Sequence, residues 1–222
     1  MLGRLKERRA TGRLPAPVRR FYRAALAEAR ASEDTFSLRS VSRPGNLAEL
    51  LALARGADTI VELGTCTAWT SIALALNAPA ARIVTFDPVV HEQRERYLAL
   101  VDPAVRARIS FHAEPGVDGT DRAADVDFLF IDSTHQHAPT VAEHRAWRPR
   151  LRPGATVVFD DYGHPDYPGV AQAVADLGLV GEQRGSLYVW RADGAPARDA
   201  GAPVSSSPPP ASTASTPPND AR

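Results

Sequence analysis

The segment Thr59-Ile60-Val61-Glu62-Leu63-Gly64-Thr65-Cys66-Thr67-Ala68 decides the fold. Its first five residues form an apolar run that predicts a buried strand, and the glycine that follows allows a sharp turn. A helix is expected directly after the turn, from about Ala68 to Leu76. A ligand at such a strand-to-helix turn meets free backbone N–H groups at the positive end of the helix.

Strands and helices alternate along the rest of the chain. Further strands are expected over residues 82–86, 107–112, 126–131 and 155–159, with a closing hairpin over 180–183 and 187–190. Helices are expected over 17–31, after Pro44, and over 90–100, 139–148 and 170–177. This alternation predicts a doubly wound α/β fold, with a mostly parallel sheet that has helices on both faces. Such sheets bind ligands at the carboxyl ends of their strands.

Three parts follow from these patterns. Residues 1–55 are expected to form an N-terminal helical extension and cap, and residues 56–192 the α/β domain. Residues 193–222 are rich in Pro, Ala and Ser, and they are expected to be a disordered tail because they cannot bury enough apolar surface to offset their ordering entropy.

The composition limits the expected partners and cellular location of the protein. The 26 basic and 26 acidic side chains cancel, so nucleic acid and membrane surfaces are not expected partners. A single cysteine, Cys66, and the lack of an apolar signal segment favour a cytoplasmic protein. Homo-oligomer formation stays open. The basic stretch 1–23 keeps an enzyme that acts on nucleic acid among the alternatives, and a steep salt dependence of binding would reveal it.

Two positions indicate a nucleoside ligand. Gly64 opens the first turn, and Asp87 ends the second strand, where a carboxylate can accept hydrogen bonds from both ribose hydroxyls. A dinucleotide site would need two more glycines, but Cys66 and Trp69 stand at those positions. An NAD-dependent oxidoreductase is therefore a weaker alternative.

Three acidic residues end two strands that a doubly wound sheet makes neighbours. Asp132 follows the fourth strand, and Asp160 and Asp161 follow the fifth. Two carboxylates about 5 Å apart repel by about 3 kcal/mol at an effective dielectric near 20, so either a proton or a cation is expected between them. An all-oxygen cluster suits Mg²⁺, Mn²⁺ or Ca²⁺ better than zinc.

His135 lies three residues beyond Asp132. The pKa of a histidine lies near neutrality, which suits a general base beside the ligand. The other interpretations are a polar loop residue and a metal ligand.

Five stretches, in order, carry a resemblance to a known family: Glu62-Leu63-Gly64-Thr65, Thr85-Phe86-Asp87, Asp127 to His135, Trp147 to Ala155, and Val158-Phe159-Asp160-Asp161-Tyr162. They resemble the motifs of class I, S-adenosylmethionine-dependent methyltransferases. The likeness is greatest to the bacterial small-molecule O-methyltransferase group, which includes macrolide-sugar O-methyltransferases and proteins called cephalosporin hydroxylase. It covers about residues 40–191.

The resemblance implies a seven-stranded sheet in the order 3-2-1-4-5-7-6 and a role for each matched residue. In the cofactor site, S-adenosylmethionine would be bound by Glu62, Gly64, Thr65, Asp87, Ala113 and Glu114. The metal, Mg²⁺ or else Mn²⁺ or Ca²⁺, would be bound by Asp132, Asp160 and Asp161. The catalytic residues would be His135 and Asp132.

The implied activity is metal-assisted O-methylation of a small hydroxylated molecule. Cys66 and Ala68 replace glycines that are common in the family's first motif. That departure keeps open a second interpretation, a non-catalytic domain of the same fold that binds cofactor or a partner.

Overall fold

Seven strands form one sheet in the order β3-β2-β1-β4-β5-β7-β6 in the computed structural model, which describes residues 10–192. The strands β3, β2, β1, β4 and β5 are parallel, and β7 is antiparallel to both β5 and β6. This confirms the predicted doubly wound sheet and its closing hairpin. The strands are β1 (Thr59–Leu63), β2 (Arg82–Phe86), β3 (Ile109–His112), β4 (Val126–Ile131), β5 (Leu151–Phe159), β6 (Glu182–Arg184) and β7 (Leu187–Arg191).

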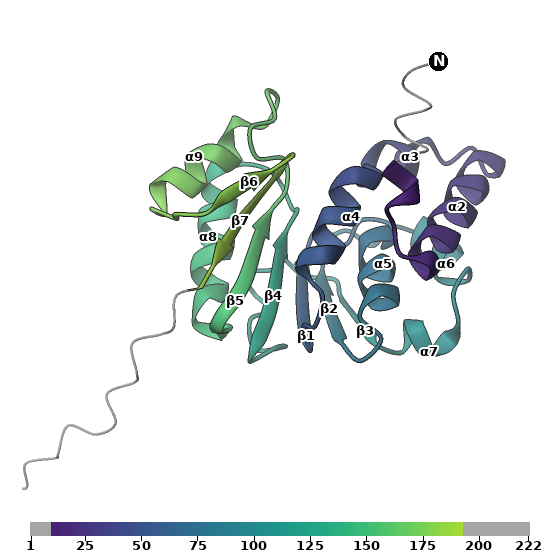
Figure 1. Cartoon of the computed structure of the whole chain (residues 1–222), viewed down its shortest axis with the longest axis horizontal. Coiled ribbons are helices and arrows are strands. Elements are labelled where there is room, and N and C mark those ends of the chain that lie inside the picture. The colour runs from purple at the N-terminus through teal and green to yellow at the C-terminus, as the bar shows by residue number, and fades with distance from the viewer. Residues whose placement is uncertain (1–9, 193–222) are drawn as a thin grey trace, which may run out of the picture.

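Helices cover both faces of the sheet (Figure 1). Successive strand residues point to opposite faces, so Ile60 belongs to one apolar cluster and Val61 to the other. The first cluster packs under α2, α4, α5 and α6, and the second under α8 and α9. The helices are α2 (Ala16–Ala31), α3 (Thr35–Ser40), α4 (Pro44–Leu53), α5 (Trp69–Asn77), α6 (Gln93–Leu98), α7 (Pro103–Arg106), α8 (His137–Trp147) and α9 (Pro168–Asp176).

Three elements differ from the sequence-based expectation. The short helices α3 and α7 were not expected, because six and four residues carry too few apolar repeats to predict a helix. The strand β5 begins at Leu151 rather than at Ala155, because Leu151 pairs with Val126 and a register shift separates this pair from the regular pairing that starts at Phe128 and Thr156. A residue pattern within one strand does not reveal a register shift of its partner.

A buried polar cluster fixes α3 to the body of the domain. Asp34 caps the helix by accepting hydrogen bonds from the backbone N–H of Ser37 at 3.0 Å and from its hydroxyl at 2.6 Å. The hydroxyl of Tyr97 in α6 donates to the same carboxylate at 2.5 Å. Each group is buried and partnered, so α3 has a defined position beside the first loop of the sheet.

His144 of α8 lies in the second apolar cluster, between the rings of Phe159 and Trp190. It is 1% exposed, and neither ring nitrogen has a hydrogen-bond partner. Burial, with the nearby charges of Arg148 and Arg145, lowers the pKa of His144 to about 4. The core therefore contains a histidine that is neutral at physiological pH.

Some expectations fall outside the described residues. They are the expected disordered tail, residues 193–222, and the first nine residues of the basic N-terminal stretch. Within residues 10–192, no helix combines the length and the apolar character needed to cross a bilayer.

Candidate functional site

The parallel strands end at the same level, which brings the residues that follow them to one edge of the sheet. Leu63 at the end of β1 pairs with Phe86 of β2 and with Ile131 of β4. Ile131 in turn pairs with Phe159 of β5. Hydrogen bonds continue one residue further, from the N–H of Asp132 to the carbonyl of Leu63 at 2.8 Å and from the N–H of Asp160 to the carbonyl of Ile131 at 3.0 Å.

The loop after β1 has a left-handed backbone at every second residue. The φ angles are +104° at Gly64, +48° at Cys66 and +68° at Ala68. A Cβ atom at Gly64 would lie 2.0 Å from the backbone oxygen of Asp132, so only glycine fits where the ends of β1 and β4 lie side by side. Cys66 and Ala68 thus keep the conformation that glycine adopts easily, at a cost of about 1–2 kcal/mol each.

Asp87 lies at the end of β2 beside this loop and is half-buried. Its Oδ2 accepts a hydrogen bond from the N–H of Cys66 at 2.8 Å, and its Oδ1 accepts one from the N–H of Val89 at 2.9 Å. The carboxylate therefore joins the two loops that follow β1 and β2, and it borders the cavity described below.

Glu62 and Thr65 lie beneath the loop. The carboxylate of Glu62 accepts hydrogen bonds from the hydroxyls of Ser71 in α5 and Thr85 in β2, while its Oε1 has no partner. Burial raises the pKa of Glu62 to about 8 against the hydrogen bonds that lower it. Thr65 shares a hydrogen bond of 2.7 Å with Thr85. Both residues are buried, so their support of the loop is indirect.

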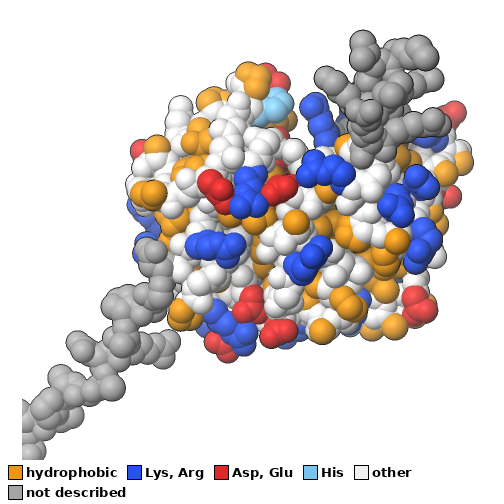
Figure 2. Space-filling model, viewed as in Figure 1, with side chains coloured by type: hydrophobic (Ala, Val, Ile, Leu, Met, Phe, Trp, Pro, Cys, Tyr) orange, Lys and Arg blue, Asp and Glu red, His pale blue; other side chains and the backbone are white. Residues whose placement is uncertain are grey.

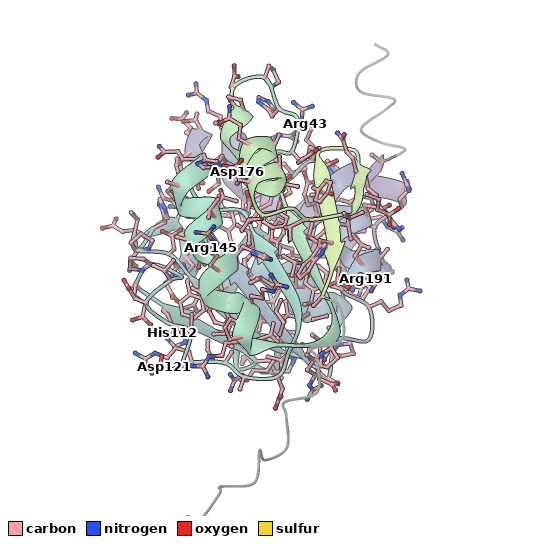
Figure 3. All side chains as sticks on the ribbon, turned by 90° about the vertical axis from the view of Figure 1, so that its left-hand side faces the viewer. Arg43, His112, Asp121, Arg145, Asp176 and Arg191 are labelled. Atoms are coloured by element: carbon pink, nitrogen blue, oxygen red, sulfur yellow. The ribbon has the colours of Figure 1, made fainter. Side chains whose placement is uncertain are left out.

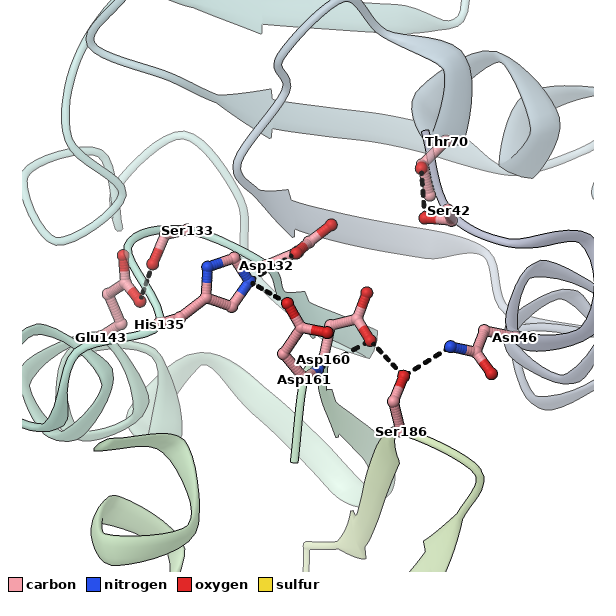
Figure 4. A network of polar contacts seen from close by, with 10 residues as sticks. All are labelled: Ser42, Asn46, Thr70, Asp132, Ser133, His135, Glu143, Asp160, Asp161 and Ser186. Carbon is pink, nitrogen blue, oxygen red and sulfur yellow. Dashed lines mark hydrogen bonds and ion pairs between the residues drawn. The ribbon is translucent and has the colours of Figure 1, made fainter. Parts of the chain in front are cut away.

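The predicted acidic cluster forms around His135. The Nε2 atom of His135 lies 3.0 Å from Oδ1 of Asp132 and 3.4 Å from Oδ2 of Asp161 (Figure 4). Both His135 and Asp161 have a left-handed backbone, with φ of +56° and +54°. Strained non-glycine residues of this kind gather at functional sites.

Burial and mutual repulsion perturb the charges of this cluster. Burial, and after it the charge of Asp160, raise the pKa of Asp132 to about 7, against the hydrogen bond from His135, which lowers it. Burial likewise raises the pKa of Asp160. For His135, burial lowers the pKa, but the hydrogen bond to Asp132 and the charges of the nearby acids outweigh burial and raise it. The carboxylates of this cluster therefore favour a positive charge among them.

Two supporting contacts at this edge were not found in the sequence. Ser186, in the turn between β6 and β7, donates to Oδ1 of Asp160 at 3.0 Å and accepts from Asn46 of α4 at 2.5 Å (Figure 4). Ser133 donates to the buried Glu143 of α8 at 2.7 Å. Ser186, Asn46 and Glu143 lie outside the stretches that carry the family resemblance, so only the folded chain identifies them.

The loop after β1, Asp87 and the acidic cluster border a cavity of about 930 Å³ at the carboxyl edge of the sheet. Of the residues predicted from the sequence, the lining includes Gly64, Asp87, Asp132, His135, Asp160 and Asp161. It does not include Glu62, Thr65, Ala113 or Glu114. At the edge where Ala113 and Glu114 were expected, Pro115, Gly116 and Val117 line the cavity instead, and Glu114 pairs with Arg122 at 3.2 Å.

The donor chemistry of the acidic cluster fits a hard divalent cation. It offers carboxylate oxygens from two strand ends, and its buried acids carry raised pKa values. In their present arrangement, however, no group of three or more His, Cys, Asp or Glu side chains among residues 10–192 is spaced to bind a metal ion.

Comparisons with known proteins agree with this geometry. Residues 61–162 match a family described as a methyltransferase domain. A comparison with curated proteins finds no match. Among solved structures, the fold is similar to the O-methyltransferase TomG from Streptomyces achromogenes, in complex with S-adenosylmethionine. The two are 26% identical with a TM-score of 0.53, over 70% of this chain and 82% of TomG.

Two other solved structures support the fold. An O-methyltransferase from Bacillus cereus in complex with S-adenosylhomocysteine is 17% identical with a TM-score of 0.60, over 78% of this chain and 90% of that one. CalS11, a TDP-rhamnose 3'-O-methyltransferase of calicheamicin biosynthesis, is 20% identical with a TM-score of 0.53, over 66% of this chain and 78% of that one. The family match over residues 61–162, the strand order and these similar structures together show that this chain contains a methyltransferase domain with the class I fold.

Proposed function

We propose that this methyltransferase transfers a methyl group to a hydroxyl of a small molecule, with the assistance of a divalent cation. The observation that carries the proposal is the single cavity that joins the loop at Gly64 and Asp87 to the cluster of Asp132, His135, Asp160 and Asp161. The TomG, Bacillus cereus and CalS11 proteins are O-methyltransferases, which supports oxygen as the acceptor atom. The single cysteine agrees with work in a reducing cytoplasm.

The cofactor half of the cavity suits a nucleoside with a charged tail. Asp87 offers carboxylate oxygens to the ribose, and the loop from Gly64 brings backbone close to the ligand. Four further residues are proposed to support the cofactor site without lining the cavity: Glu62, Thr65, Ala113 and Glu114. Glu62 and Thr65 do so through Thr85 and Ser71, which fix the loop from below.

In the other half, His135 is proposed to accept the proton of the acceptor hydroxyl. Asp132 and Asp161 hold its Nε2, and its Nδ1 makes no hydrogen bond with the described residues. A neutral His135 held in this way presents one fixed tautomer with a free acceptor nitrogen, which is the geometry that a general base needs. The methyl transfer itself is an in-line displacement, so most of the catalysis comes from positioning.

Asp132, Asp160 and Asp161 are proposed to hold the cation, with Mg²⁺ the best fit and Mn²⁺ or Ca²⁺ the alternatives. Bound there, a divalent cation would stabilise the negative charge that develops on the acceptor oxygen. Ser186 and Asn46 hold Asp160 in place for this purpose.

Two measurements test the function. Isothermal titration with S-adenosylhomocysteine measures cofactor binding, and release of a labelled methyl group from S-adenosylmethionine to a panel of hydroxylated compounds measures transfer. Binding together with transfer to oxygen, and faster transfer in Mg²⁺ than in EDTA, is the expected result. Absence of cofactor binding contradicts the proposal.

The role of His135 is tested by His135→Gln, because glutamine keeps a hydrogen-bonding group near Asp132 but is not a base. The expected kcat falls by about 10²–10⁴-fold with cofactor affinity retained. His137→Gln is the matched control, since His137 pairs with the exposed Asp176 at 2.7 Å and does not line the cavity. Equal kcat values for the two variants would show that His135 is not the base.

A further inference from the structure

Two arginines line the cavity, one from α3 and one from the start of α4. Arg39 lies near the end of α3, and Arg43 immediately precedes α4. Both side chains are exposed, and neither makes a hydrogen bond or an ion pair with another residue of the described chain. Figure 3 shows Arg43 at the end of the molecule where the loop from β5 to α9 also lies.

The other charged side chains around the cavity differ in this respect. The carboxylate of Asp87 accepts two backbone N–H groups, and Asp132 and Asp161 flank His135. Asp160 accepts from Ser186, and Glu143 accepts from Ser133. In contrast to these carboxylates, the guanidinium groups of Arg39 and Arg43 have no hydrogen-bond or ion-pair partner among the described residues.

The backbone that carries the two arginines is firmly placed. The Asp34 cluster fixes α3, and Asn46 ties the first turn of α4 to Ser186. Because the backbone is already fixed, the two exposed side chains lose only side-chain entropy when they bind a ligand. In Figure 2, basic side chains lie near the top of the molecule, and an exposed histidine lies close to them.

The cavity therefore carries both kinds of charge, with carboxylates at the sheet edge and guanidinium groups on α3 and at the start of α4. An anion placed near Asp132 and Asp160 would be repelled, whereas the same anion at Arg39 and Arg43 would gain charge-assisted hydrogen bonds. Such a cavity would orient an acceptor with its hydroxyl toward His135 and its anionic group toward the arginines.

We propose that the methyl acceptor carries an anionic group, a carboxylate or a phosphate, that binds Arg39 and Arg43. The proposal rests on the function proposed above and narrows its substrate class. Arginine suits this role because its planar fork binds carboxylate or phosphate through two parallel hydrogen bonds.

The first test is anion binding, which needs no turnover. The full chain, preloaded with S-adenosylhomocysteine, is titrated with inorganic pyrophosphate and, in parallel, with succinate. Preference for one of the two probes identifies a phosphate or a carboxylate site. Arg39→Gln and Arg43→Gln are each expected to weaken binding by about 10-fold, and the double variant more than either.

Arg23→Gln is the matched control, because Arg23 is an exposed arginine of α2 that does not line the cavity. It is expected to bind both probes as the wild type does. The proposal is overturned if the wild type binds neither probe, or if the double variant binds them as tightly as the wild type.

A second measurement separates this proposal from the function on which it rests. Methyl transfer is compared between 3,4-dihydroxybenzoate and 3,4-dihydroxybenzyl alcohol, which differ mainly in the anionic group. A KM at least about 10-fold lower for the acid, lost in the double variant with kcat retained, supports the proposal. Equal KM values overturn it. Failure of S-adenosylhomocysteine to bind, by contrast, contradicts the methyltransferase function and leaves pyrophosphate binding as an independent measurement.

Discussion

Replacement of Gly64 by alanine tests the central geometric feature, the close approach of the ends of β1 and β4. The added Cβ would lie 2.0 Å from the oxygen and 2.7 Å from the carbon of the Asp132 carbonyl group. These are backbone atoms, so no rotamer change relieves the overlap, and the ends of the two strands must separate. The perturbation therefore acts on the fold and on the position of Asp132 together.

The expected loss of stability has two parts. A left-handed alanine costs about 1–2 kcal/mol, and forcing extra volume between packed groups costs about 1–3 kcal/mol. The smaller entropy of the unfolded alanine chain offsets about 0.4–1 kcal/mol. The net effect is a loss of about 1–4.5 kcal/mol in the free energy of unfolding, which lowers the Tm by roughly 2–18 °C for a domain of this size.

Gly56→Ala provides the matched control. Gly56 has φ of +82°, similar in sign and region to Gly64, but nothing lies within 4 Å of a Cβ placed there. Backbone strain alone should lower the free energy of unfolding of this variant, by about 1 kcal/mol. Urea unfolding of both variants gives the comparison directly, and cofactor titration should show a loss of affinity for Gly64→Ala alone. If the two variants are equally stable, the steric reasoning about the contact between Gly64 and the backbone of Asp132 is refuted.

Two further predictions concern titratable groups. His144 has a pKa of about 4 when folded against 6.5 when unfolded, so the unfolded chain binds more protons between these values, and stability falls as pH drops. Between pH 7.5 and pH 5, His144 lowers the free energy of unfolding by about 2 kcal/mol, and the His144→Leu variant should lack this loss. If the urea midpoints at the two pH values differ as much in the variant as in the wild type, the prediction is wrong. Asp160→Asn should abolish the stimulation of methyl transfer by Mg²⁺ while cofactor affinity is retained, because asparagine still accepts from Ser186. Asp176→Asn, outside the cavity, should behave as the wild type, and loss of all cofactor affinity in Asp160→Asn would show that its role was misassigned.

Much of the site followed from strand ends that the sequence already marked. Apolar runs that stop at Gly64, Asp87, Asp132 and Asp160 predict where parallel strands end. Because the parallel strands of such a sheet end at one edge, the prediction that these residues meet did not depend on side-chain detail. The structure places all four on one cavity.

Other assignments depended on which way a side chain points. The family motif indicated Glu62 and Thr65 as neighbours of the cofactor, yet the pleat of β1 and the turn after it direct both into the interior, beneath the loop. Motif matching assigns a position along the chain, whereas the twist of the strand and the φ angles of the loop decide which face the side chain reaches.

The sequence by itself determined the doubly wound sheet, because periodicity and turn residues are local properties that each segment carries alone. It also determined the acids that crowd at the carboxyl edge. Only the tertiary structure decided which groups complete the site: Asn46, Ser186 and Glu143 reach it from distant segments, and Arg39 and Arg43 reach it through α3 and α4. These contacts arise from packing between elements far apart in the chain, and no local pattern encodes which polar side chains such packing leaves partnered and which it leaves open to a ligand.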